Sequence, residues 1–508
     1  MTIPRYAHPR NLRTPHPFHR IAAPRDLIVV LDGALTGGDV DGTGVYQGYA
    51  TIGGGATGHP DVEAVLRDQV RGPLIDLYQI ADNLDTVGNI VAGDLNPYND
   101  CIDLDYRVPA GVGVRGINYG TEMIEHAQDL ARRLALPDDE TYAGMVVARA
   151  GGDFDADLIV TGRDWLLNLR HDPSERGLDQ VVSPAEAIAL IGLYRRWHHR
   201  PTIIAGQSVN WPPVAMHRSI AFVAMPGFER WNQAARAAYD DRADDSLHAR
   251  TMSLLTRVSR AFRYRDAVFA EWTTLDDYDR DELLCELELL LVSLVGAFDV
   301  AAEIVAQLLN LQIKGHIGWQ NDHFIKQLET VAPPLSTLTK KGSLLHQRMD
   351  LVRRLRNSIH TQALSIRVDD KRAVLTLPEP VQHHLRATAL SSDNPWTAHE
   401  LGIHRILPGG ATAHKWLDGV GRYTVTVRRS GAPRPTDPLD GELTLDPGQF
   451  LNWMFQDCIS DLDQIMNLTP LAEVPGYRPQ WENPPRGGLA WTFSDTTATR
   501  LRLLYGDV

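Results

Sequence analysis

The feature that most restricts the fold is an apolar stretch in the middle of the chain, LELLLVSLVGAF, which begins at Leu287. It lies within a longer helical pattern, residues 280–311, whose apolar residues cover much of the helix circumference. Glu286 and Asp299 flank the stretch and Glu288 interrupts it, so it is too short to span a bilayer. The pattern therefore predicts a long helix that is buried inside a bundle of other helices.

Helical patterns also occupy the sequence around this stretch. Between about 216 and 365, segments such as LLTRVSRAFRYRDAVFAEW and SLLHQRMDLVRRLRNSIHTQ carry apolar residues at helical spacing. Strand-like pieces such as AVLTL and GELTL follow, then one last helical pattern, PGQFLNWMFQDCISDLDQIMNL, and a tail rich in Pro and Gly. We predict a helical domain over 216–370. Over 371–508 we expect strands, a final helix and an irregular tail.

The first half of the chain has a different pattern, in which strand-like and helix-like segments alternate from residue 26 to about 205. DLIVVL and DADLIVTG are typical of buried strands, and GTEMIEHAQDLARRLAL between them is typical of a helix. Such alternation indicates an α/β domain with a mostly parallel sheet. We predict this domain over 26–210, preceded by an arm, residues 1–25, that is rich in Pro, His and Arg.

Composition narrows the classes of protein to which the chain can belong. Its 508 residues exceed the size at which a single core stops growing, so two or three domains are expected. The net charge of −14 argues against a protein that coats nucleic acid without specificity. Three cysteines without a CxxC pair argue against a disulfide framework or a thiolate metal site. With no secretory signal in the arm, the cytoplasm is the expected compartment.

Several carboxylates occur at the ends of the elements predicted for the first half. Asp32 follows the first buried strand, Asp157 begins a later strand and Asp164 comes shortly after it, while Asp139 and Glu140 begin a helix. If these strands are neighbours, the carboxylates converge at one edge and could bind Mg²⁺ or Mn²⁺ for phosphodiester hydrolysis. The structural alternative is that Asp is common in such places because it caps helices and forms turns.

Three stretches of this half, DLIVVLDGAL, EMIEHAQDLARRL and DETYAGMVVARAGGDFDADLIVTGRDWLL, resemble the PIN-domain nucleases. The resemblance covers roughly 26 to 200 and implies a PIN-like fold with a metal site. It implies ligands at Asp32, Glu122 or Glu125, Asp139 or Glu140, Asp157, and Asp164. The chain departs from the family in a long insertion after Asp32 and in an extra residue between Thr161 and the last acid. This half of the chain is therefore expected to be an active nuclease domain, a domain with altered activity or an inactive scaffold.

Basic side chains are concentrated in LVRRLRNSIHTQALSIRV, residues 351–368. In a helix, Arg353, Arg356 and His360 lie at positions i, i+3 and i+7 and share a face. Guanidinium groups suit a phosphate, and an imidazole titrates near neutral pH. These groups can cleave RNA without a metal: His360 would take the proton of a 2′-hydroxyl, arginine would stabilise the phosphorane, and Asn357 would hold the imidazole or the sugar. The structural alternative is that they complement the helix dipole and pair with acids on a neighbouring helix.

A long helical pair followed by RRLRNSIH resembles the HEPN superfamily, over about 250 to 365. In that superfamily, domains of four or five helices carry an arginine, usually followed by a polar residue such as Asn, and a histidine four to six residues beyond. Many members are ribonucleases of toxin and antiviral systems, and they act as dimers with the motif of both chains in one cleft. The spacing here is short, because three residues separate Arg356 from His360; counting from Arg354 or Arg353 gives five or six.

Together the two resemblances predict an endoribonuclease of a bacterial toxin or antiviral-defence system. We expect a cytoplasmic homodimer that acts on RNA at the Arg/His site without a cofactor and does not bind a membrane. The resemblances also allow Mg²⁺ or Mn²⁺ at the acidic site, and an accessory or antitoxin protein as a partner. Two alternatives stay open: a non-catalytic dimeric interaction or sensor protein, and a metal-dependent DNase or nucleotide hydrolase that uses only the acids.

Overall fold

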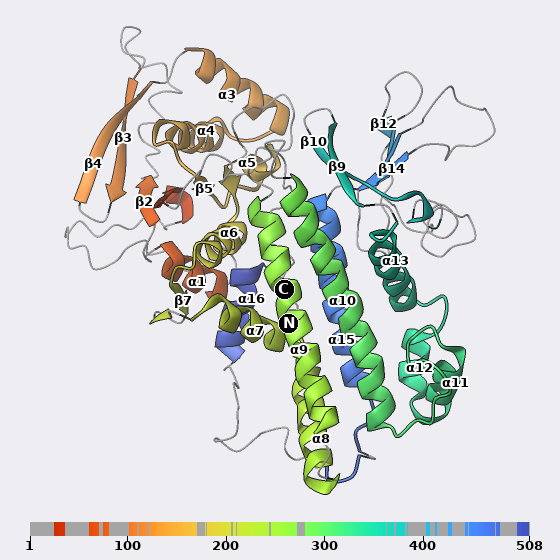
Figure 1. Cartoon of the computed structure of the whole chain (residues 1–508). Helices are drawn as coiled ribbons and strands as arrows, with labels where there is room; N and C mark the ends of the chain where they lie inside the picture. Colours follow the sequence, from red (N-terminus) through yellow and green to blue (C-terminus); the bar gives the residue numbers. More distant parts are fainter. Residues whose placement is uncertain are drawn as a thin grey trace. The chain divides into compact units, whose positions relative to one another are not determined.

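Figure 1 shows the computed structural model of the whole chain. The structure describes residues 25–35, 60–70, 75–80, 101–108, 111–118, 121–169, 178, 180–204, 207–209, 211–242, 245–271, 280–361, 363–369, 372–381, 384, 403–406, 412–413, 425–428, 442–445, 447–472, 474–477 and 495–506. The chain divides into two compact units. Among the described residues, the N-terminal unit comprises 25–211 and 495–506, and the C-terminal unit comprises 212–477.

The N-terminal unit contains a small, mostly parallel sheet, as the alternating pattern predicted. Its strands are β1 (Leu27–Leu31), β2 (Ile75–Ile80), β3 (Cys101–Val108), β4 (Gly111–Asn118), β5 (Leu158–Val160) and β6 (Val181–Val182). β1 lies between β2 and β5 and runs parallel to both, and β6 is parallel to β5. β3 and β4 add an antiparallel hairpin next to β2. Since β5 is apolar and buried throughout and β1 is buried except for the half-buried Ile28, they form the centre of this core.

Helices pack around this sheet. They are η1 (Gly33–Leu35), α1 (Pro60–Val70), α3 (Thr121–Leu134), α4 (Asp138–Asp153), α5 (Asp164–Leu169), α6 (Pro184–Trp197) and α16 (Asp495–Tyr505), and a short hairpin of β7 (Thr202–Ile204) and β8 (Gln207–Val209) completes the unit. α4 packs closely against its neighbours because glycines face them: a Cβ on Gly151 would lie 2.0 Å from Ile159, and one on Gly144 would lie 2.2 Å from Trp165. This packing holds the first turn of α4 beside the loop that follows β5.

The last helix, α16, belongs to the N-terminal unit, although no helix was predicted after residue 468. It packs on α6, where a Cβ on Gly192 would lie 2.4 Å from the carbonyl oxygen of Leu504. The Arg196 guanidinium donates to the same oxygen at 2.7 Å and lies 3.7 Å from the centre of the Tyr505 ring. α6 itself starts with a capping box formed by Ser183 and Glu186, and nearly all of its residues are buried.

The C-terminal unit is mainly helical. Its helices are α7 (Pro213–Ala224), α8 (Gly227–Arg242), α9 (Ser246–Glu271), α10 (Arg280–Leu308), α11 (Asp322–Val331), α12 (Pro333–Thr339), α13 (Leu344–Ser358) and α15 (Pro447–Leu468). The long helices α9 and α10 pack along each other, and α13 and α15 pack on α10 (Figure 1). The predicted central helix is therefore present as α10. By length and composition alone it could cross a membrane, but 67% of its most apolar window is buried inside the protein, as in a core helix.

A second sheet in this unit contains the strands expected after residue 365. They are β9 (Ser365–Asp369), β10 (Arg372–Thr376), β11 (Ile403–Ile406), β12 (Thr412–Ala413), β13 (Val425–Arg428) and β14 (Glu442–Leu445), in the order β12-β11-β13-β14-β10-β9. α13, which precedes β9, is joined to α15 by a buried ion pair. The Arg348 guanidinium contacts both carboxylate oxygens of Asp461, with Nε at 2.7 Å from Oδ2. This pair fixes the position of α13 within the unit.

Candidate functional site

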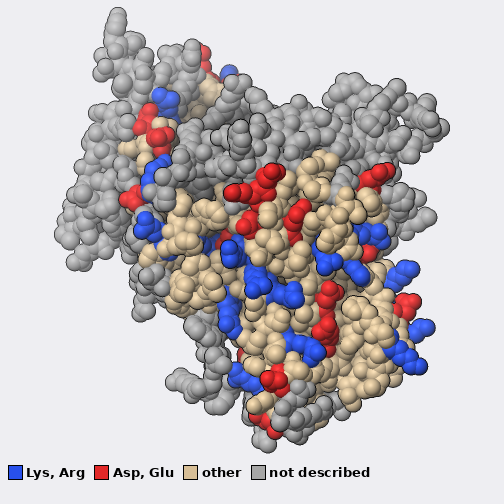
Figure 2. Space-filling view, in the orientation of Figure 1, with Lys and Arg blue, Asp and Glu red and all other residues tan. Residues whose placement is uncertain are grey.

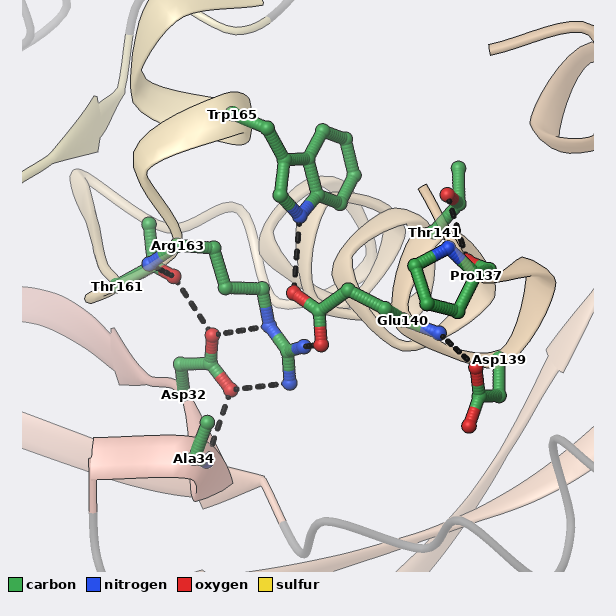
Figure 3. Close-up of polar contacts among 9 residues, drawn as sticks. All are labelled: Asp32, Ala34, Pro137, Asp139, Glu140, Thr141, Thr161, Arg163 and Trp165. Carbon is green, nitrogen blue, oxygen red and sulfur yellow. Dashed lines mark hydrogen bonds and ion pairs between the residues drawn. The ribbon is translucent and has the colours of Figure 1, made fainter. Parts of the chain in front are cut away.

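Asp32 lies at the carboxyl end of β1, as predicted, and is 1% exposed. Its Oδ2 accepts hydrogen bonds from Thr161 Oγ1 at 2.6 Å and from Arg163 Nε at 2.8 Å. Its Oδ1 accepts from the backbone N–H of Ala34 at 3.0 Å and from Arg163 Nη2 at 3.3 Å (Figure 3). Both carboxylate oxygens therefore already have protein donors.

Arg163 joins Asp32 to a second carboxylate. Its Nη1 lies 2.5 Å from Glu140 Oε2, and Trp165 Nε1 donates to the other oxygen of Glu140 at 2.9 Å (Figure 3). Burial alone would lower the pKa of Arg163, but the charges of Asp32 and Glu140 raise that pKa above its ordinary value. The guanidinium is thus a permanent cation between two carboxylates.

These residues do not fit the Mg²⁺ or Mn²⁺ site that the resemblance to PIN-domain nucleases implies. A divalent ion needs carboxylate oxygens that are free to coordinate it, whereas Asp32 and Glu140 direct theirs at Arg163. Within the ranges given above, no group of three His, Cys, Asp or Glu side chains could hold a metal ion.

The prediction that Asp157 lies beside Asp32 is wrong. β1 and β5 are parallel, so Asp157, which precedes β5, lies at the opposite end of the sheet from Asp32, which follows β1. The backbone N–H of Asp157 donates to Ile28, whereas that of Asp32 donates to Val160. The Asp157 carboxylate accepts two hydrogen bonds from Arg25, at 2.7 and 2.8 Å, and one from the backbone N–H of Ile28. Its role here is to attach the segment before β1 to the sheet.

The other predicted ligands do not join Asp32 either. Asp164 is exposed at the start of α5, and exposed Asp139 accepts a hydrogen bond from the backbone N–H of Glu140. Glu122 is in the first turn of α3, and its side chain lies outside the described residues, while Glu125 is exposed. Of the alternatives at the start of α4, the structure brings Glu140 rather than Asp139 toward Asp32.

The predicted Arg/His site lies at the end of α13. The helix ends at Ser358, so His360 is exposed in the turn that follows and not on a helical face, where it was expected. Arg353 and Asn357 are also exposed, and Arg356 is half-buried. Asn357 Oδ1 accepts a hydrogen bond from Arg356 Nη1 at 2.9 Å, so the amide orients the guanidinium rather than the imidazole. Arg356 Nε is buried and, among the described residues, has no hydrogen-bond partner.

Two groups of arginines on α13 differ in their partners. Arg348 pairs with Asp461, and Arg354 Nε lies 2.8 Å from Asp350 Oδ2. By contrast, Arg353, Arg356 and His360 make no ion pair with any acid that the structure describes. One part of the structural alternative, pairing with acids on a neighbouring helix, therefore has no support in the described part of the chain. The other part holds for Arg356, which lies in the last turn of α13, where a cation complements the helix dipole.

A cavity of about 350 Å³ lies next to Arg353, between α10, α13 and the segment that precedes α11. Its apolar lining includes Val295, Phe298, Trp319 and Val352, all buried, and its polar lining includes Asp299, His316, Gln320 and Asn321. The sequence analysis did not identify this segment, because its residues lie in a loop without periodicity.

Among the described residues on the face shown in Figure 2, groups of Lys and Arg are interspersed with groups of Asp and Glu. Comparisons with protein-family models, with curated proteins and with solved structures found no match to this chain. The assignment of function therefore depends on the chemistry of the residues themselves.

Proposed function

We propose that the chain is a metal-independent endoribonuclease of a toxin or antiviral-defence system, and that it cleaves RNA at the end of α13. The observation that carries this proposal is the contrast between the arginines of α13. Arg356 is oriented by Asn357 and, like Arg353 and His360, has no acidic partner among the described residues. Guanidinium groups that no described acid neutralises, beside an exposed imidazole, can bind and cleave a phosphodiester.

In the proposed reaction, His360 takes the proton of a ribose 2′-hydroxyl, and the 2′-oxygen attacks the adjacent phosphorus. The bond between phosphorus and the 5′-oxygen breaks, and that oxygen receives a proton from an imidazolium. The products are a 2′,3′-cyclic phosphate and a 5′-hydroxyl. Arg356 stabilises the negative charge of the phosphorane, a contribution that is typically large in such reactions.

The active form in this proposal is a homodimer, in which both copies of His360 serve one cleft. α10 presents exposed Cys285, Leu289 and Val292, which recur on one side of the helix; the two aliphatic side chains are 38% and 42% exposed. A two-fold contact is the commonest way to cover such a face.

Val292→Glu should lower both the dimer fraction in light scattering and the cleavage rate. Val331→Glu, at a position 45% exposed on α11, is the matched control and should change neither.

The decisive experiment compares RNA cleavage by His360→Ala, Arg356→Ala and Arg354→Ala in EDTA. We expect the first two to lose at least about 100-fold in rate, since removal of a general base or of a charge-stabilising group has effects of this size. Arg354→Ala is the matched control, because Arg354 is on the same helix but pairs with Asp350. Full activity of His360→Ala, or loss of cleavage in EDTA, would refute the mechanism. A stable dimer without any cleavage would favour the non-catalytic interaction protein.

A further inference from the structure

The cavity beside Arg353 is a preformed pocket. Trp319 Nε1 donates to the carbonyl oxygen of Phe298 at 2.8 Å, which fixes the indole on α10. The Asn321 amide donates to the carbonyl oxygen of His316 at 2.5 Å, and Gly315, directly before His316, has a φ of +84°, a conformation that favours glycine. The segment is therefore held in place by its own contacts before any ligand binds.

The inner wall of this pocket is apolar and partly aromatic. Phe298 and Trp319 are each 4% exposed, and Val295 and Val352 are also buried. With about 350 Å³ the cavity is at the lower end of the range of roughly 300–1,000 Å³ for small-molecule sites. Such a volume suits a planar base with its sugar better than a large cofactor.

The polar groups at its rim are available to a ligand. Arg353, Asp299, His316 and Gln320 all line the cavity and are exposed, and none of these side chains has a polar partner among the described residues. The rim thus offers a carboxylate, a guanidinium and an imidazole around an apolar wall. A ligand that satisfies all of them needs hydrogen-bond donors at one end, an anion at the other and an apolar plane between.

We infer that this pocket binds a guanine nucleotide, with the base on the Phe298 and Trp319 wall, Asp299 at its Watson–Crick edge and Arg353 at its phosphate. Guanine has two adjacent donors on that edge, N1–H and the 2-amino group, and a carboxylate can accept from both. Adenine and cytosine have a single amino donor there beside a ring-nitrogen lone pair, and uracil has a single N3–H between two carbonyl oxygens. None of the three offers two adjacent donors, and each places an acceptor against the second oxygen of the carboxylate. Splayed-out bases of single-stranded RNA are commonly bound through this edge.

This inference rests on the proposed function in one respect: in a ribonuclease, the pocket would select a guanosine next to the bond that is cleaved. Arg353 precedes Arg356 by three residues on α13, so a phosphate at Arg353 lies on the same side of the helix as Arg356. Cleavage would then occur preferentially beside guanosine.

The test is calorimetric binding of GMP, AMP and guanosine to the full-length chain, which does not depend on cleavage. We expect GMP to bind at least about tenfold more tightly than AMP, and Asp299→Asn to remove most of this preference, because a bidentate contact to a base edge discriminates by about this factor. Arg353→Ala should bring the affinity for GMP down to that for guanosine. Asp281→Asn, an equally conservative change at an exposed position of α10, is the control and should change neither.

Binding and cleavage separate the two proposals. Equal affinity for GMP and AMP, or a preference that Asp299→Asn leaves intact, would overturn the guanine pocket even if RNA were cleaved. Selective GMP binding without RNA cleavage would support the pocket and refute the ribonuclease. If RNA is cleaved, the RNA fragments produced by the wild-type protein should end at guanosine. The RNA fragments produced by Asp299→Asn should show no such preference.

Discussion

Replacing Arg163 by glutamine should destabilise the N-terminal unit by about 3 kcal/mol. Removing one partner of a buried ion pair leaves the other charge uncompensated, which costs about 3–5 kcal/mol. Asp32 is 1% exposed and would lose its contacts with the guanidinium, but it keeps the hydrogen bonds from Thr161 and Ala34. The lower end of the range therefore applies. Glu140 adds little, because its side chain is 37% exposed and solvent screens its pair with Arg163.

The assay is hydrogen exchange of the peptides that contain β1 and β5, which reports the local opening free energy in the full-length chain. Arg149→Gln makes the same substitution in the exposed Arg149–Asp153 pair of α4 and should cost less than about 1 kcal/mol. Asp32→Asn combined with Arg163→Gln should recover part of the loss, since no buried charge is then unpaired. Equal effects of Arg163→Gln and Arg149→Gln would refute the reasoning. Stabilisation of the wild-type protein by Mn²⁺ would also refute the reasoning, because a metal ion would then occupy the position of the Arg163 guanidinium.

Three further predictions concern stability elsewhere in the chain. Arg348→Gln should lower the free energy of unfolding of the C-terminal unit by about 3–5 kcal/mol in urea denaturation, because Asp461 is buried and loses its partner; an effect below about 1 kcal/mol would contradict this. Ala135→Gly should raise stability by about 0.5–1 kcal/mol in the same assay, since Ala135 ends α3 with a φ of 52°, a conformation that favours glycine. Burial lowers the pKa of His346, so the neutral imidazole is favoured in the folded state. Its contribution to stability is therefore present above pH ~6.5 and falls below it, and the difference between pH 7 and pH 5 should be smaller in His346→Gln.

The main elements followed from periodicity, because burial on one face or all round leaves a direct pattern in the sequence. The predicted buried strands correspond to β1 and β5, and the long apolar pattern corresponds to α10. The helix α16 could not be predicted in the same way. It has little pattern of its own and is held by contacts with α6, such as the hydrogen bond from Arg196 to Leu504 across more than 300 positions of sequence.

The acidic site shows which step of sequence reasoning failed. Asp32 follows β1 and Asp157 precedes β5. Because β1 and β5 are parallel, these two positions lie at opposite ends of the strands. The positions of the two aspartates relative to their strands can be read from the sequence, and they are incompatible with one shared metal site. Arg163 was missed for a different reason: its long side chain reaches Asp32 only because β5 is the neighbour of β1, and strand order is not encoded in local spacing.

An Arg–Asp ion pair lies at each end of the paired strands β1 and β5. Arg163 pairs with Asp32 at one end, and Arg25 pairs with Asp157 at the other. Each aspartate is almost completely buried, and each accepts backbone hydrogen bonds in addition to the guanidinium. Carboxylates in such surroundings hold strands together, and they have no free oxygen with which to orient water or a metal ion. A nuclease that used only these acids would have to break the contacts that stabilise its own sheet. Arg353 and Arg356 at the end of α13 have no acidic partner among the described residues, so our proposal places RNA cleavage beside them and not at these acids.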